Sequence, residues 1–509
     1  MLWRGKLRKR KCLIPNNRFY KNMRIKSEIN SDTNSGNFYI TTTLAYVNAE
    51  PHIGFAMEIT RADITARFKR LRGFNVFFNT GTDEHGLKIY RKALENGQDP
   101  QAYVDSMAEK FKELVQVLNL SHGINFIRTS DENHKKSARE FWKVCDKNGY
   151  IYKKNYKIKY CVGCELEKTE SEMKDGRCPL HPNQEIETVD EENYFFAFSK
   201  FQKSLLELYE NNPAFVVPSS RLKEVKAFVE SGLEDFSISR LKRKMPWGIE
   251  VPDDPEHVMY VWFDALVSYI SAIGWPDNTD GFSKWWPVTQ YCGKDNLRQQ
   301  AAMLQAMLMA TGLSNSKQII VNGFITSGGQ KMSKSLGNTI SPTEVVVEYG
   351  VDALRYYFAR ELNPFEDSDF TMDKFKEAYN ANLANGLGNL TSRIIKMSET
   401  YLEKPVGVET KFGFPNKFVE CLEKFELNKA MDLIWEKIAE ADAYIQREQP
   451  FKIAKEDLIQ GRKMITYLVR ELRDIAYLIQ IFMPGTSEII QKIIAENKMP
   501  KEALFPRKI

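Results

Sequence analysis

The sequence predicts an α/β fold in which a parallel β-sheet is split by an inserted module and followed by a helical bundle. Near the start, a strand-like run, a helix-like run and a second strand-like run follow one another within residues 38–80, which is a βαβ unit. Strand-like runs of this kind stop over residues 147–250 and then return. From about residue 375 onward, apolar residues recur three and four positions apart, which is typical of amphipathic helices.

The βαβ unit consists of strands rich in β-branched and aromatic residues on either side of one helix. We expect the first strand at Phe38–Thr43, the helix over about 53–72 and the second strand at Asn75–Thr80. Gly73 ends the helix in the usual C-terminal manner. A longer helix is expected from Pro100 to Leu118.

The rest of the sheet and the bundle are predicted from apolar patterns further along the chain. Parallel strands are expected at Met259–Phe263, Gln290–Cys292 and Gln318–Asn322. Three apolar stripes follow: Leu383, Leu387, Leu390, Ile394, Met397 and Tyr401; Leu427, Met431, Ile434, Ile438, Ala441 and Ile445; and Ile465, Leu468, Leu472, Ile475, Ile479 and Phe482. Each stripe is the buried face of one helix, and together they predict a helical bundle.

Length and composition are those of a globular protein with about three domains of roughly 150 residues each. Of the 509 residues, 43% are hydrophobic and 27% charged, which excludes collagen, low-complexity chains and bulk disorder. No stretch approaches the ~18 uninterrupted apolar residues of a membrane helix. Seven cysteines in a chain of this length are not a disulfide framework, so we expect a reduced, cytoplasmic protein.

The first 36 residues differ in charge from everything after them. They carry ten basic and two acidic side chains, a net charge of +8, whereas the remaining 62 basic and 65 acidic side chains give −3. The overall charge of +5 therefore belongs to this segment. Three interpretations stay open: a disordered basic tail or a mis-assigned start for which Met23 is the true start, an RNA-contacting arm, and a transit peptide that would make the protein organellar.

The segment Pro51–Phe55 lies where the first strand leads into the helix. A helix N-terminus offers unbonded N–H groups and the positive end of the helix dipole to a phosphate. Gly54 has no Cβ, so a flat ring can approach the backbone, and His52 can donate to an oxygen that gains charge during a reaction. Taken alone, a helix-capping histidine explains this motif better.

The segment Lys331–Ser335 reads Lys-Met-Ser-Lys-Ser and follows the glycine-containing run Ser327–Gln330. Two lysines three positions apart on a glycine-flanked loop suit a mobile clamp that holds polyphosphate with point charges. A charged loop is usually solvated surface, but this string is rare and comes after a strand that ends at Asn322. The motif therefore favours a polyphosphate site.

Four metal-ligating residues form two close pairs, Cys161-x-x-Cys164 and Cys178-x-x-His181. With thirteen residues between the pairs, the spacing suits tetrahedral Zn²⁺. Three thiolates and one imidazole fill all four positions, so the predicted site is structural rather than catalytic.

Together, the two loop motifs resemble the His-Ile-Gly-His and Lys-Met-Ser-Lys-Ser signatures of class I aminoacyl-tRNA synthetases. Four further strings narrow the resemblance to the methionyl-tRNA synthetase family: Tyr39-Ile-Thr-Thr-Thr-Leu-Ala-Tyr-Val-Asn48, Gly81-Thr-Asp-Glu-His-Gly86, Tyr260-Val-Trp-Phe-Asp-Ala-Leu266 and Gly293-Lys-Asp295. The resemblance extends from about residue 37 to the end of the chain. It implies a Rossmann-like parallel sheet split by a zinc-bearing connective insertion, followed by an α-helical anticodon-binding domain.

The resemblance implies a methionine–tRNA ligase, which activates methionine with ATP to methionyl-adenylate and transfers it to the 3′-terminal adenosine of tRNA(Met). Mg²⁺ would accompany ATP. In-line attack of a carboxylate on the α-phosphorus needs positioning and positive charge more than a covalent nucleophile. The implied catalytic residues are His52, Arg240, Lys294, Lys331 and Lys334. The implied ATP-binding residues are His52, Gly54, Gly293, Lys294, Asp295, Lys331, Ser333 and Lys334.

A methionine pocket is also implied. Asp83 matches the carboxylate that pairs with the substrate ammonium. The implied wall consists of Leu44, Tyr46, Trp262, Ala265, Leu266 and Tyr269, with Gln300 beside it. A thioether is apolar, polarizable and only a weak acceptor, so aromatic walls are an apt selector. Without the resemblance, core packing explains Trp262 and Tyr269 better.

Two segments near the implied site depart from the family pattern, at Phe55 and at Gln299-Gln300. The second histidine of the first signature is Phe55 here, and phenylalanine cannot donate to a phosphate oxygen. Gln299 and Gln300 stand where the family has a phenylalanine and then a histidine. An amide still donates a hydrogen bond but does not titrate, so the pH dependence and shape of the pocket are expected to differ.

The implied anticodon-reading residues lie in the helical part. Asn389 and Arg393 match the family's reading pair and, four positions apart, project from one helix face. Phe451 stands where the family often has a tryptophan, a third departure, but phenylalanine still stacks on a base. Without the resemblance, a solvated helix face explains the pair better.

The predicted domains are a basic extension (1–36), the first half of the catalytic domain (37–146), the connective insertion with its zinc knuckle (147–250), the second catalytic half (251–325), the lysine loop with a stem-contact segment (326–375) and the anticodon-binding domain (376–509). No tRNA-binding or dimerisation domain is expected beyond the third stripe, so we predict a monomer. Its expected partners are methionine, ATP and tRNA(Met), with no membrane.

Related activities fit less well. A cysteinyl-type synthetase places a metal-binding cysteine in the first strand's motif, where Thr43-Leu44 stands. A leucine-, isoleucine- or valine-type synthetase needs a large editing insertion, for which the chain has no room. A tRNA-binding protein that has lost catalysis is supported by Phe55 but opposed by the intact lysine loop.

Overall fold

A seven-stranded sheet lies at the centre of the protein in the computed structural model, which describes residues 36–164, 166–168, 172–332, 339–407 and 413–508. The strand order is β2-β3-β1-β13-β14-β8, with β4 beside β3, and every pairing is parallel. The predicted parallel sheet is therefore confirmed. The strands are β1 (Asn37–Thr41), β2 (Ala45–Tyr46), β3 (Asn75–Asp83), β4 (Asn125–Arg128), β8 (Val216–Val217), β13 (Val288–Gly293) and β14 (Gln318–Asn322).

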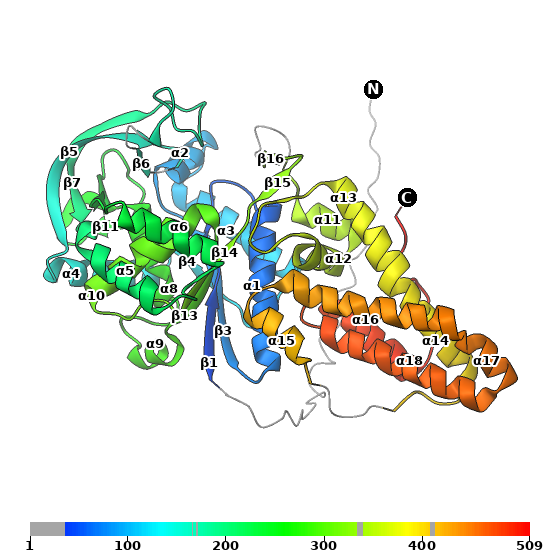
Figure 1. The fold of residues 1–509 in the computed structure, drawn as a ribbon. Coiled ribbons are helices and arrows are strands. Elements are labelled where there is room, and N and C mark those ends of the chain that lie inside the picture. The colour runs from blue at the N-terminus through cyan, green and yellow to red at the C-terminus, as the bar shows by residue number, and fades with distance from the viewer. Residues whose placement is uncertain (1–35, 165, 169–171, 333–338, 408–412, 509) are drawn as a thin grey trace, which may run out of the picture.

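Helices cover both faces of this sheet (Figure 1). Neighbouring residues of β1 point to opposite faces and so enter different cores. Phe38 and Ile40 lie in the core that α1 shares with the C-terminal helices, whereas Tyr39 lies in the core formed with α4 and α10. The helices of this half are α1 (Ile53–Leu71), α2 (Leu87–Glu95), α3 (Pro100–Val117), α4 (Glu132–Lys147), α5 (Gln202–Asn211), α6 (Ser219–Glu230), α7 (Val261–Leu266), α8 (Ser268–Ser271), α9 (Thr279–Trp285) and α10 (Leu304–Thr311).

Two small antiparallel sheets lie at one end of the molecule (Figure 1), and they combine strands of the predicted insertion with residues 251–259, which the sequence analysis assigned to the second catalytic half. One has the order β6-β5-β7-β9 and the other β10-β12-β11. Their strands are β5 (Ile151–Cys161), β6 (Leu166–Lys168), β7 (Glu187–Phe196), β9 (Phe236–Ser237), β10 (Ser239–Leu241), β11 (Glu250–Val251) and β12 (Asp254–Met259). Because β8 pairs with β14, residues 147–250 are not wholly separate from the main sheet.

The strand predicted at Met259–Phe263 is wrong. The chain leaves β12 at Met259, and helix α7 begins at Val261. A five-residue apolar run carries no periodicity that separates a strand from a fully packed helix. Here the tertiary surroundings decide, because α7 buries Val261 and Phe263 on different sides.

The C-terminal half is helical after a small sheet in which β15 (Ile325–Ser327) pairs with β16 (Gln330–Lys331) and β17 (Ser368–Asp369). The three apolar stripes are confirmed on a π-helical stretch (Tyr379–Gly388) continued by α14 (Asn389–Tyr401), on α16 (Leu427–Glu448) and on α18 (Leu458–Ile479), except that Phe482, the last residue of the third stripe, is buried just beyond the end of α18. The other helices are α11 (Pro342–Tyr349), α12 (Val351–Tyr356), α13 (Met372–Ala378), α15 (Asn416–Glu423), α17 (Pro450–Glu456) and α19 (Pro484–Glu496). The last of these lies beyond the predicted stripes.

Two fully buried arginines join α1 to the C-terminal half. Arg61 donates to the carbonyl oxygen of Leu362 at 3.0 Å. Arg355 of α12 pairs with Asp63 at 2.8 Å and donates to the carbonyl oxygen of Phe482 at 2.7 Å. Because an unpaired buried charge is costly, these bonds fix how the helical half sits against the sheet. No spacing pattern in the sequence predicts them.

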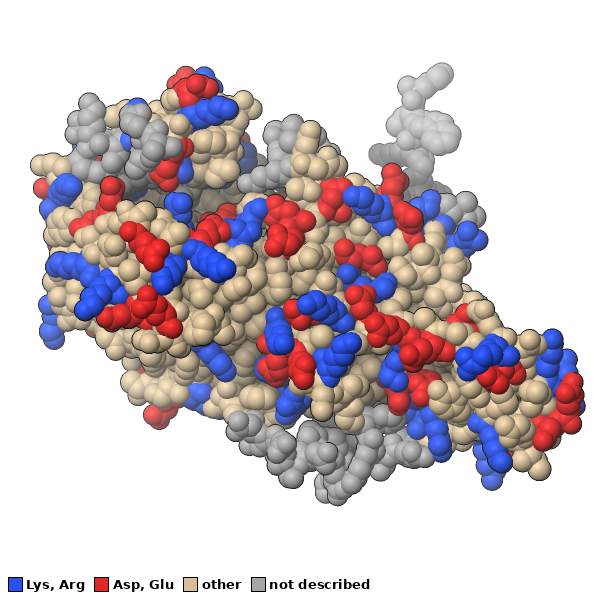
Figure 2. Space-filling view, viewed as in Figure 1, with Lys and Arg blue, Asp and Glu red and all other residues tan. Residues whose placement is uncertain are grey.

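The predicted basic extension, 1–36, lies outside the described residues except for Gly36. In the part of the chain that is described, no helix combines the length and the apolar character needed to cross a membrane. On the face drawn in Figure 2, basic and acidic side chains are interspersed over the described surface. Binding of a nucleic acid to this face would therefore depend on local contacts rather than on a broad basic surface.

Candidate functional site

Several described residues among those predicted to bind ATP and methionine lie at the carboxyl end of the main sheet. Leu44 and Tyr46 follow β1, Asp83 ends β3, and Lys294 follows β13. β1 lies between β3 and β13, so the winding of the chain reverses there. In open α/β sheets, ligands bind outside the carboxyl ends of the strands at such a reversal.

His52 is exposed and caps α1. Its Nδ1 accepts a hydrogen bond from the Gly54 N–H at 3.1 Å. A Cβ on residue 54 would lie 3.0 Å from the imidazole, so the glycine permits this cap. With Nδ1 accepting, the ring proton of the neutral imidazole is on Nε2. The same histidine therefore caps the helix and can present a donor at its N-terminus.

Phe55 is half-buried rather than turned to solvent. Its ring packs edge-on against Phe111 of α3, with the ring centroids 5.1 Å apart. The residue thus contributes packing between α1 and α3 where the family signature would have a hydrogen-bond donor.

We expect Phe55→His to raise the rate of methionine activation by at most about 10²- to 10³-fold, because one transition-state donor is typically worth roughly 2.7–4 kcal/mol. Loss of the contact with Phe111 should lower the melting temperature at the same time. Pyrophosphate exchange and thermal unfolding measure the two effects. Phe55→Leu, which loses the ring contact without adding a donor, is the control. An unchanged or lower rate would show that the pocket compensates for Phe55 in another way.

Lys294 is held at the start of the segment after β13. Its ammonium lies 2.6 Å from Asp367 and 4.3 Å from the centre of the Phe324 ring. Partial burial raises the pKa of Asp367, but hydrogen bonds from Lys294 and from the Phe324 N–H outweigh it and leave that pKa below its ordinary value. A phosphate bound here would compete with Asp367 for the ammonium. Gly293 and Asp295 flank Lys294, as predicted.

The predicted lysine clamp lies only partly within the described residues. The backbone of Lys331 belongs to β16, whereas Ser333 and Lys334 lie outside the described residues. The β15–β16 hairpin is fixed by the Gly329 N–H, which donates to Asp369 of β17 at 2.9 Å. The clamp loop therefore starts from an anchored hairpin.

A buried carboxyl group that sequence reasoning missed, Glu58, lies beneath the predicted ATP site. Its Oε1 accepts a hydrogen bond from the Thr43 N–H at 2.9 Å. The pKa of Glu58 is raised to about 7. Burial is the main cause and the nearby charge of Asp295 adds to the rise, whereas the hydrogen bond from Thr43 partly offsets it. Glu58 therefore keeps its proton to a higher pH in the folded protein than in the unfolded chain.

We expect Glu58→Gln to stabilise the protein at pH 8 but not at pH 5. The folded pKa lies above the unfolded value, so the wild type loses stability as the pH rises from about 4.5 to about 7. The upper bound is about 3 kcal/mol, since one pKa unit corresponds to about 1.4 kcal/mol. The melting temperature of Glu58→Gln minus that of wild type should be roughly 2–4 °C larger at pH 8 than at pH 5. A pH-independent difference would contradict this account.

The carboxylate and the aromatic wall predicted for methionine lie side by side. Tyr46 in β2 pairs directly with Asp83 in β3. Tyr46 and Trp262 both pack against the cluster of Tyr160, Tyr260 and Val261. The Trp262 indole N–H makes no hydrogen bond within the described residues, so it can donate to a ligand. An ammonium group and an apolar side chain can be bound together here.

The inner end of this region is a hydrogen-bonded amide network. Gln300 is fully buried and donates through Nε2 to the Tyr269 hydroxyl at 2.6 Å, while Gln290 donates to Gln300 Oε1 at 3.1 Å. Gln299 is buried beside it, as are the predicted wall residues Leu44, Ala265 and Leu266. The Gln300 amide thus hydrogen-bonds the Tyr269 hydroxyl, and unlike a histidine ring it does not titrate.

Arg240 lies in β10 and is surrounded by groups that suit a structural cation. It is 6% exposed, and its guanidinium lies 5.1 Å from the Tyr160 ring centre and 4.4 Å from that of Tyr260. It also donates to Ser237 Oγ at 2.8 Å. In this conformation Arg240 connects the insertion to the residue that precedes α7.

The four predicted metal ligands come together, with all their donor atoms within 4.8 Å of one another. Cys164 Sγ lies 3.4 Å from Cys178 Sγ and 3.2 Å from His181 Nδ1. In a tetrahedral site with bonds of about 2.0–2.3 Å, ligand atoms lie roughly 3.3–3.8 Å apart, so the set fits Zn²⁺. A Cβ on Gly163 would approach the His181 ring to 2.5 Å, which explains the glycine between the first two cysteines.

Arg393 and Phe451 line one cavity of about 390 Å³ in the helical part, which is thereby a candidate base-binding pocket. Arg393 pairs with Asp442 of α16. Asn389 is exposed one turn earlier on α14. The remaining lining residues, which sequence reasoning missed, are Ser392, Lys396, Met397, Ile445 and Met499.

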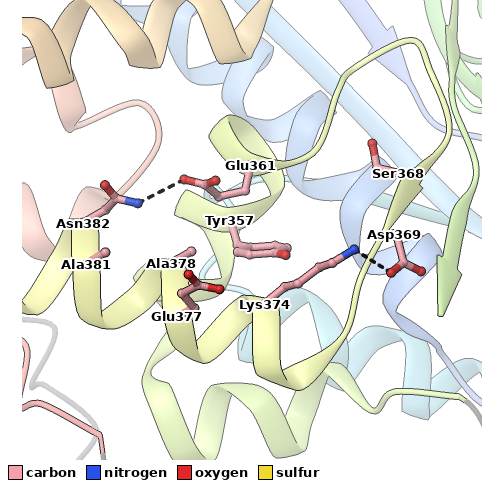
Figure 3. Close-up of a pocket in the computed structure, with 9 residues that line it drawn as sticks. All are labelled: Tyr357, Glu361, Ser368, Asp369, Lys374, Glu377, Ala378, Ala381 and Asn382. Atoms are coloured by element: carbon pink, nitrogen blue, oxygen red, sulfur yellow. Dashed lines mark hydrogen bonds and ion pairs between the residues drawn. The ribbon is translucent and has the colours of Figure 1, made fainter. Parts of the chain in front are cut away.

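A larger cavity of about 510 Å³ lies between the β17 region and the helices α13 and Tyr379–Gly388, and no predicted site residue lines it. Figure 3 shows Lys374 reaching Asp369 and Asn382 directed at Glu361. Three carboxylates, Glu361, Asp369 and Glu377, surround a single lysine. Such a charge balance does not suit a polyphosphate, so this cavity is not the predicted ATP site.

Comparison with known proteins bears on the whole chain. The family described as "tRNA synthetases class I (M)" matches residues 38–187 and 167–395. The methionine–tRNA ligase of Thermotoga maritima is 42% identical over 92% of this chain and 77% of its own length. That of Rickettsia felis is 40% identical over 92% of this chain and 93% of its own length.

A solved structure is also similar throughout. The Mycobacterium tuberculosis methionyl-tRNA synthetase, in complex with methionyl-adenylate, superposes with a TM-score of 0.85 at 32% identity. The match covers 93% of this chain and 100% of the other. Both the sheet domain and the helical part are therefore shared.

Proposed function

The chain belongs to the methionine–tRNA ligase family of class I tRNA synthetases, and from that premise we propose how its residues activate methionine with ATP and charge tRNA. In the first step, a methionine carboxylate oxygen attacks the α-phosphorus of ATP, and pyrophosphate leaves. In the second, a ribose hydroxyl of the tRNA 3′-terminal adenosine attacks the carbonyl carbon of the adenylate. The ester forms and AMP leaves.

Methionine is positioned by Asp83 and an aromatic wall. The Asp83 carboxylate pairs with the substrate ammonium, which leaves the substrate carboxylate directed at ATP. Tyr46 and Trp262 contact the thioether side chain, a polarizable group that aromatic faces accommodate well. The observation that carries the proposal is that Tyr46 and Asp83 are paired across β2 and β3, so one β-bridge fixes wall and anchor together.

ATP is held by groups at the N-terminus of α1 and after β13. His52 donates from Nε2 to a phosphate oxygen, and Gly54 allows the ring of adenine or ribose to approach the helix. Lys294, Lys331 and Lys334 offset the charge of the leaving pyrophosphate. We propose that Mg²⁺ accompanies ATP and that Ser333, Gly293 and Asp295 complete the site.

We propose that Cys161, Cys164, Cys178 and His181 hold a structural Zn²⁺. The ion, when bound, fixes the tip of the insertion by joining two short loops. The protein's own contribution is a preformed set of ligand atoms within 4.8 Å and the close approach at Gly163.

We propose that Asn389, Arg393 and Phe451 read the anticodon, and we expect Phe451→Ala to lower kcat/KM for tRNA(Met) charging by about 5- to 150-fold. This corresponds to the 1–3 kcal/mol typical of one base–aromatic stack. Methionine-dependent pyrophosphate exchange should not change, because that reaction needs no tRNA. Lys437→Ala, which removes a helical-domain lysine paired with Glu471 at 3.1 Å, is the control. Equal losses in both assays would contradict the proposal.

Charging of tRNA tests the proposed function as a whole. The purified chain, ATP and bacterial tRNA should form an acid-precipitable ester with labelled methionine but not with labelled cysteine. No ester, or an ester with cysteine, would refute it. The monomeric state and cytoplasmic location expected from the sequence stay predictions.

A further inference from the structure

A buried carboxylate on α7, Asp264, lies between two histidines. Asp264 Oδ2 accepts a hydrogen bond from His85 Nδ1 at 2.9 Å, and Oδ1 lies 3.4 Å from His134 Nε2. The other ring nitrogen of His134 lies 3.0 Å from Ser271 Oγ. Asp264 and His134 are fully inaccessible, and His85 is 2% exposed. Three separate elements, α7, α4 and the turn after β3, therefore meet at one carboxylate.

The two sides of the His85–Asp264 bond carry the two halves of the methionine site. His85 follows Asp83, the proposed ammonium anchor, by two residues. Asp264 lies between Trp262 and Ala265, two residues of the proposed wall. The bond therefore sets the separation between the end of β3 and α7.

The turn that carries His85 is anchored on its other side as well. The Trp247 indole N–H donates to the Glu84 carbonyl oxygen at 2.6 Å, and the Gly86 N–H donates to the Trp247 carbonyl oxygen at 3.3 Å. Trp247 also packs on the His85 ring, with centroids 5.6 Å apart. The turn is thus rigid, so a change at Asp264 is passed to Asp83 rather than absorbed between them.

The cost of burying this carboxylate argues that the geometry is specific. A fully buried carboxylate without hydrogen-bond partners costs several kcal/mol. Burial raises the pKa of Asp264, but the charge of His85 and the hydrogen bonds from His134 and His85 outweigh it, so the pKa lies below its ordinary value. An apolar pair would hold α7 against β3 equally well, but without fixing the angle and distance to one value.

We infer that Asp264 and His85 are positioning residues for methionine: their hydrogen bond holds the ammonium anchor and the aromatic wall at the separation that the substrate requires. The inference rests on the proposed function, in which Asp83 and Trp262 contact methionine. Neither Asp264 nor His85 touches the substrate. Loss of the bond therefore acts on methionine binding and leaves the ATP groups, which lie on α1 and after β13, in place.

Two substitutions of His85 separate the hydrogen bond from ring packing. His85→Phe keeps a ring against Trp247 but removes the Nδ1 donor. His85→Asn removes the ring but places an amide nitrogen close to the position of Nδ1. We expect the KM for methionine in pyrophosphate exchange to rise about tenfold or more in His85→Phe, since misplacements of about 1 Å can cost 10²-fold. His85→Asn should restore it to within about threefold.

The readout includes quantities that a merely structural loss would not move. The KM for ATP should stay within about twofold of wild type in both variants, and methionine should stabilise His85→Phe against heat less than it does wild type. Asp352→Asn is the control, because Asp352 is also a buried carboxylate, hydrogen-bonded to the Thr486 N–H in the helical half. Its KM for methionine should not change, even if its melting temperature falls.

The outcomes separate the inference from the function on which it rests. Exchange that does not depend on methionine in the wild type would refute the proposed function. Methionine-dependent exchange in the wild type, with His85→Phe folded and its KM for methionine unchanged, would overturn the positioning role alone. Equal rises in the KM values for methionine and ATP, or a KM defect in Asp352→Asn, would also overturn it.

Discussion

Replacing Asp83 by asparagine is expected to lower kcat/KM for methionine by about 30- to 5,000-fold. Under the proposed function, the substitution removes the counter-ion of the methionine ammonium group, and losing one partner of a buried, hydrogen-bonded charge pair costs about 2–5 kcal/mol. Asparagine has the size of aspartate, so the β2–β3 pairing at Tyr46 should persist. Pyrophosphate exchange at varied methionine measures the loss.

The loss should be confined to methionine. The KM for ATP should change by less than about threefold, since the ATP groups lie on other elements. Asp277→Asn removes the same charge from an exposed carboxylate that pairs with Lys136 at 2.6 Å, and its activity should match wild type. A fall of less than about threefold in kcat/KM for Asp83→Asn would contradict the assignment of the anchor.

Removal of the metal is expected to unfold the tip of the insertion. In small domains, structural zinc sites contribute about 10–16 kcal/mol of apparent free energy to folding at pH 7. The few short strands near the proposed site cannot supply a comparable stabilisation without the metal. Protein purified without chelator should hold one equivalent of zinc per chain. A strong chelator should remove it and expose residues 161–181 to proteolysis.

The loss of zinc should also weaken methionine binding at the proposed methionine site. Tyr160, next to the ligand Cys161, packs on Arg240, which in turn packs on Tyr260 at the start of α7. We therefore expect the KM for methionine to rise in Cys178→Ser. Cys421→Ser, a buried thiol of α15, is the control and should keep its zinc. Clearly less than one equivalent in the wild type, or full zinc content in Cys178→Ser, would contradict the site.

Elements with strong periodicity were predictable from the sequence. Strand β1, helix α1 and strand β3 lie close to their predicted bounds, and the three apolar stripes are the buried faces of the predicted helices. Met259–Phe263 was not predictable, because a short apolar run fits a strand and a fully packed helix equally well. The pairing of β8 with the main sheet also depends on long-range contacts, since two valines carry no periodic signal.

The candidate site was likewise predictable from the sequence only in part. Cysteine and histidine spacing predicted the metal cluster, whose four donor atoms do converge. Arg240 could be matched to a family position, but its packing between Tyr160 and Tyr260 depends on partners 80 residues before and 20 residues after it. In the sequence, Glu58 looks like an ordinary helix residue, and Asp264 looks like a polar residue that follows a predicted strand. Their importance lies in burial and in partners that only the fold brings together.

ATP–pyrophosphate exchange on the purified protein, with each amino acid supplied in turn, measures whether this chain activates methionine. We expect methionine to support exchange, cysteine, leucine, isoleucine and valine to do so at far lower kcat/KM, and omission of the amino acid to abolish it. Exchange supported equally by cysteine, exchange without any amino acid, or no exchange with methionine would show that the chain is not a methionine-activating enzyme.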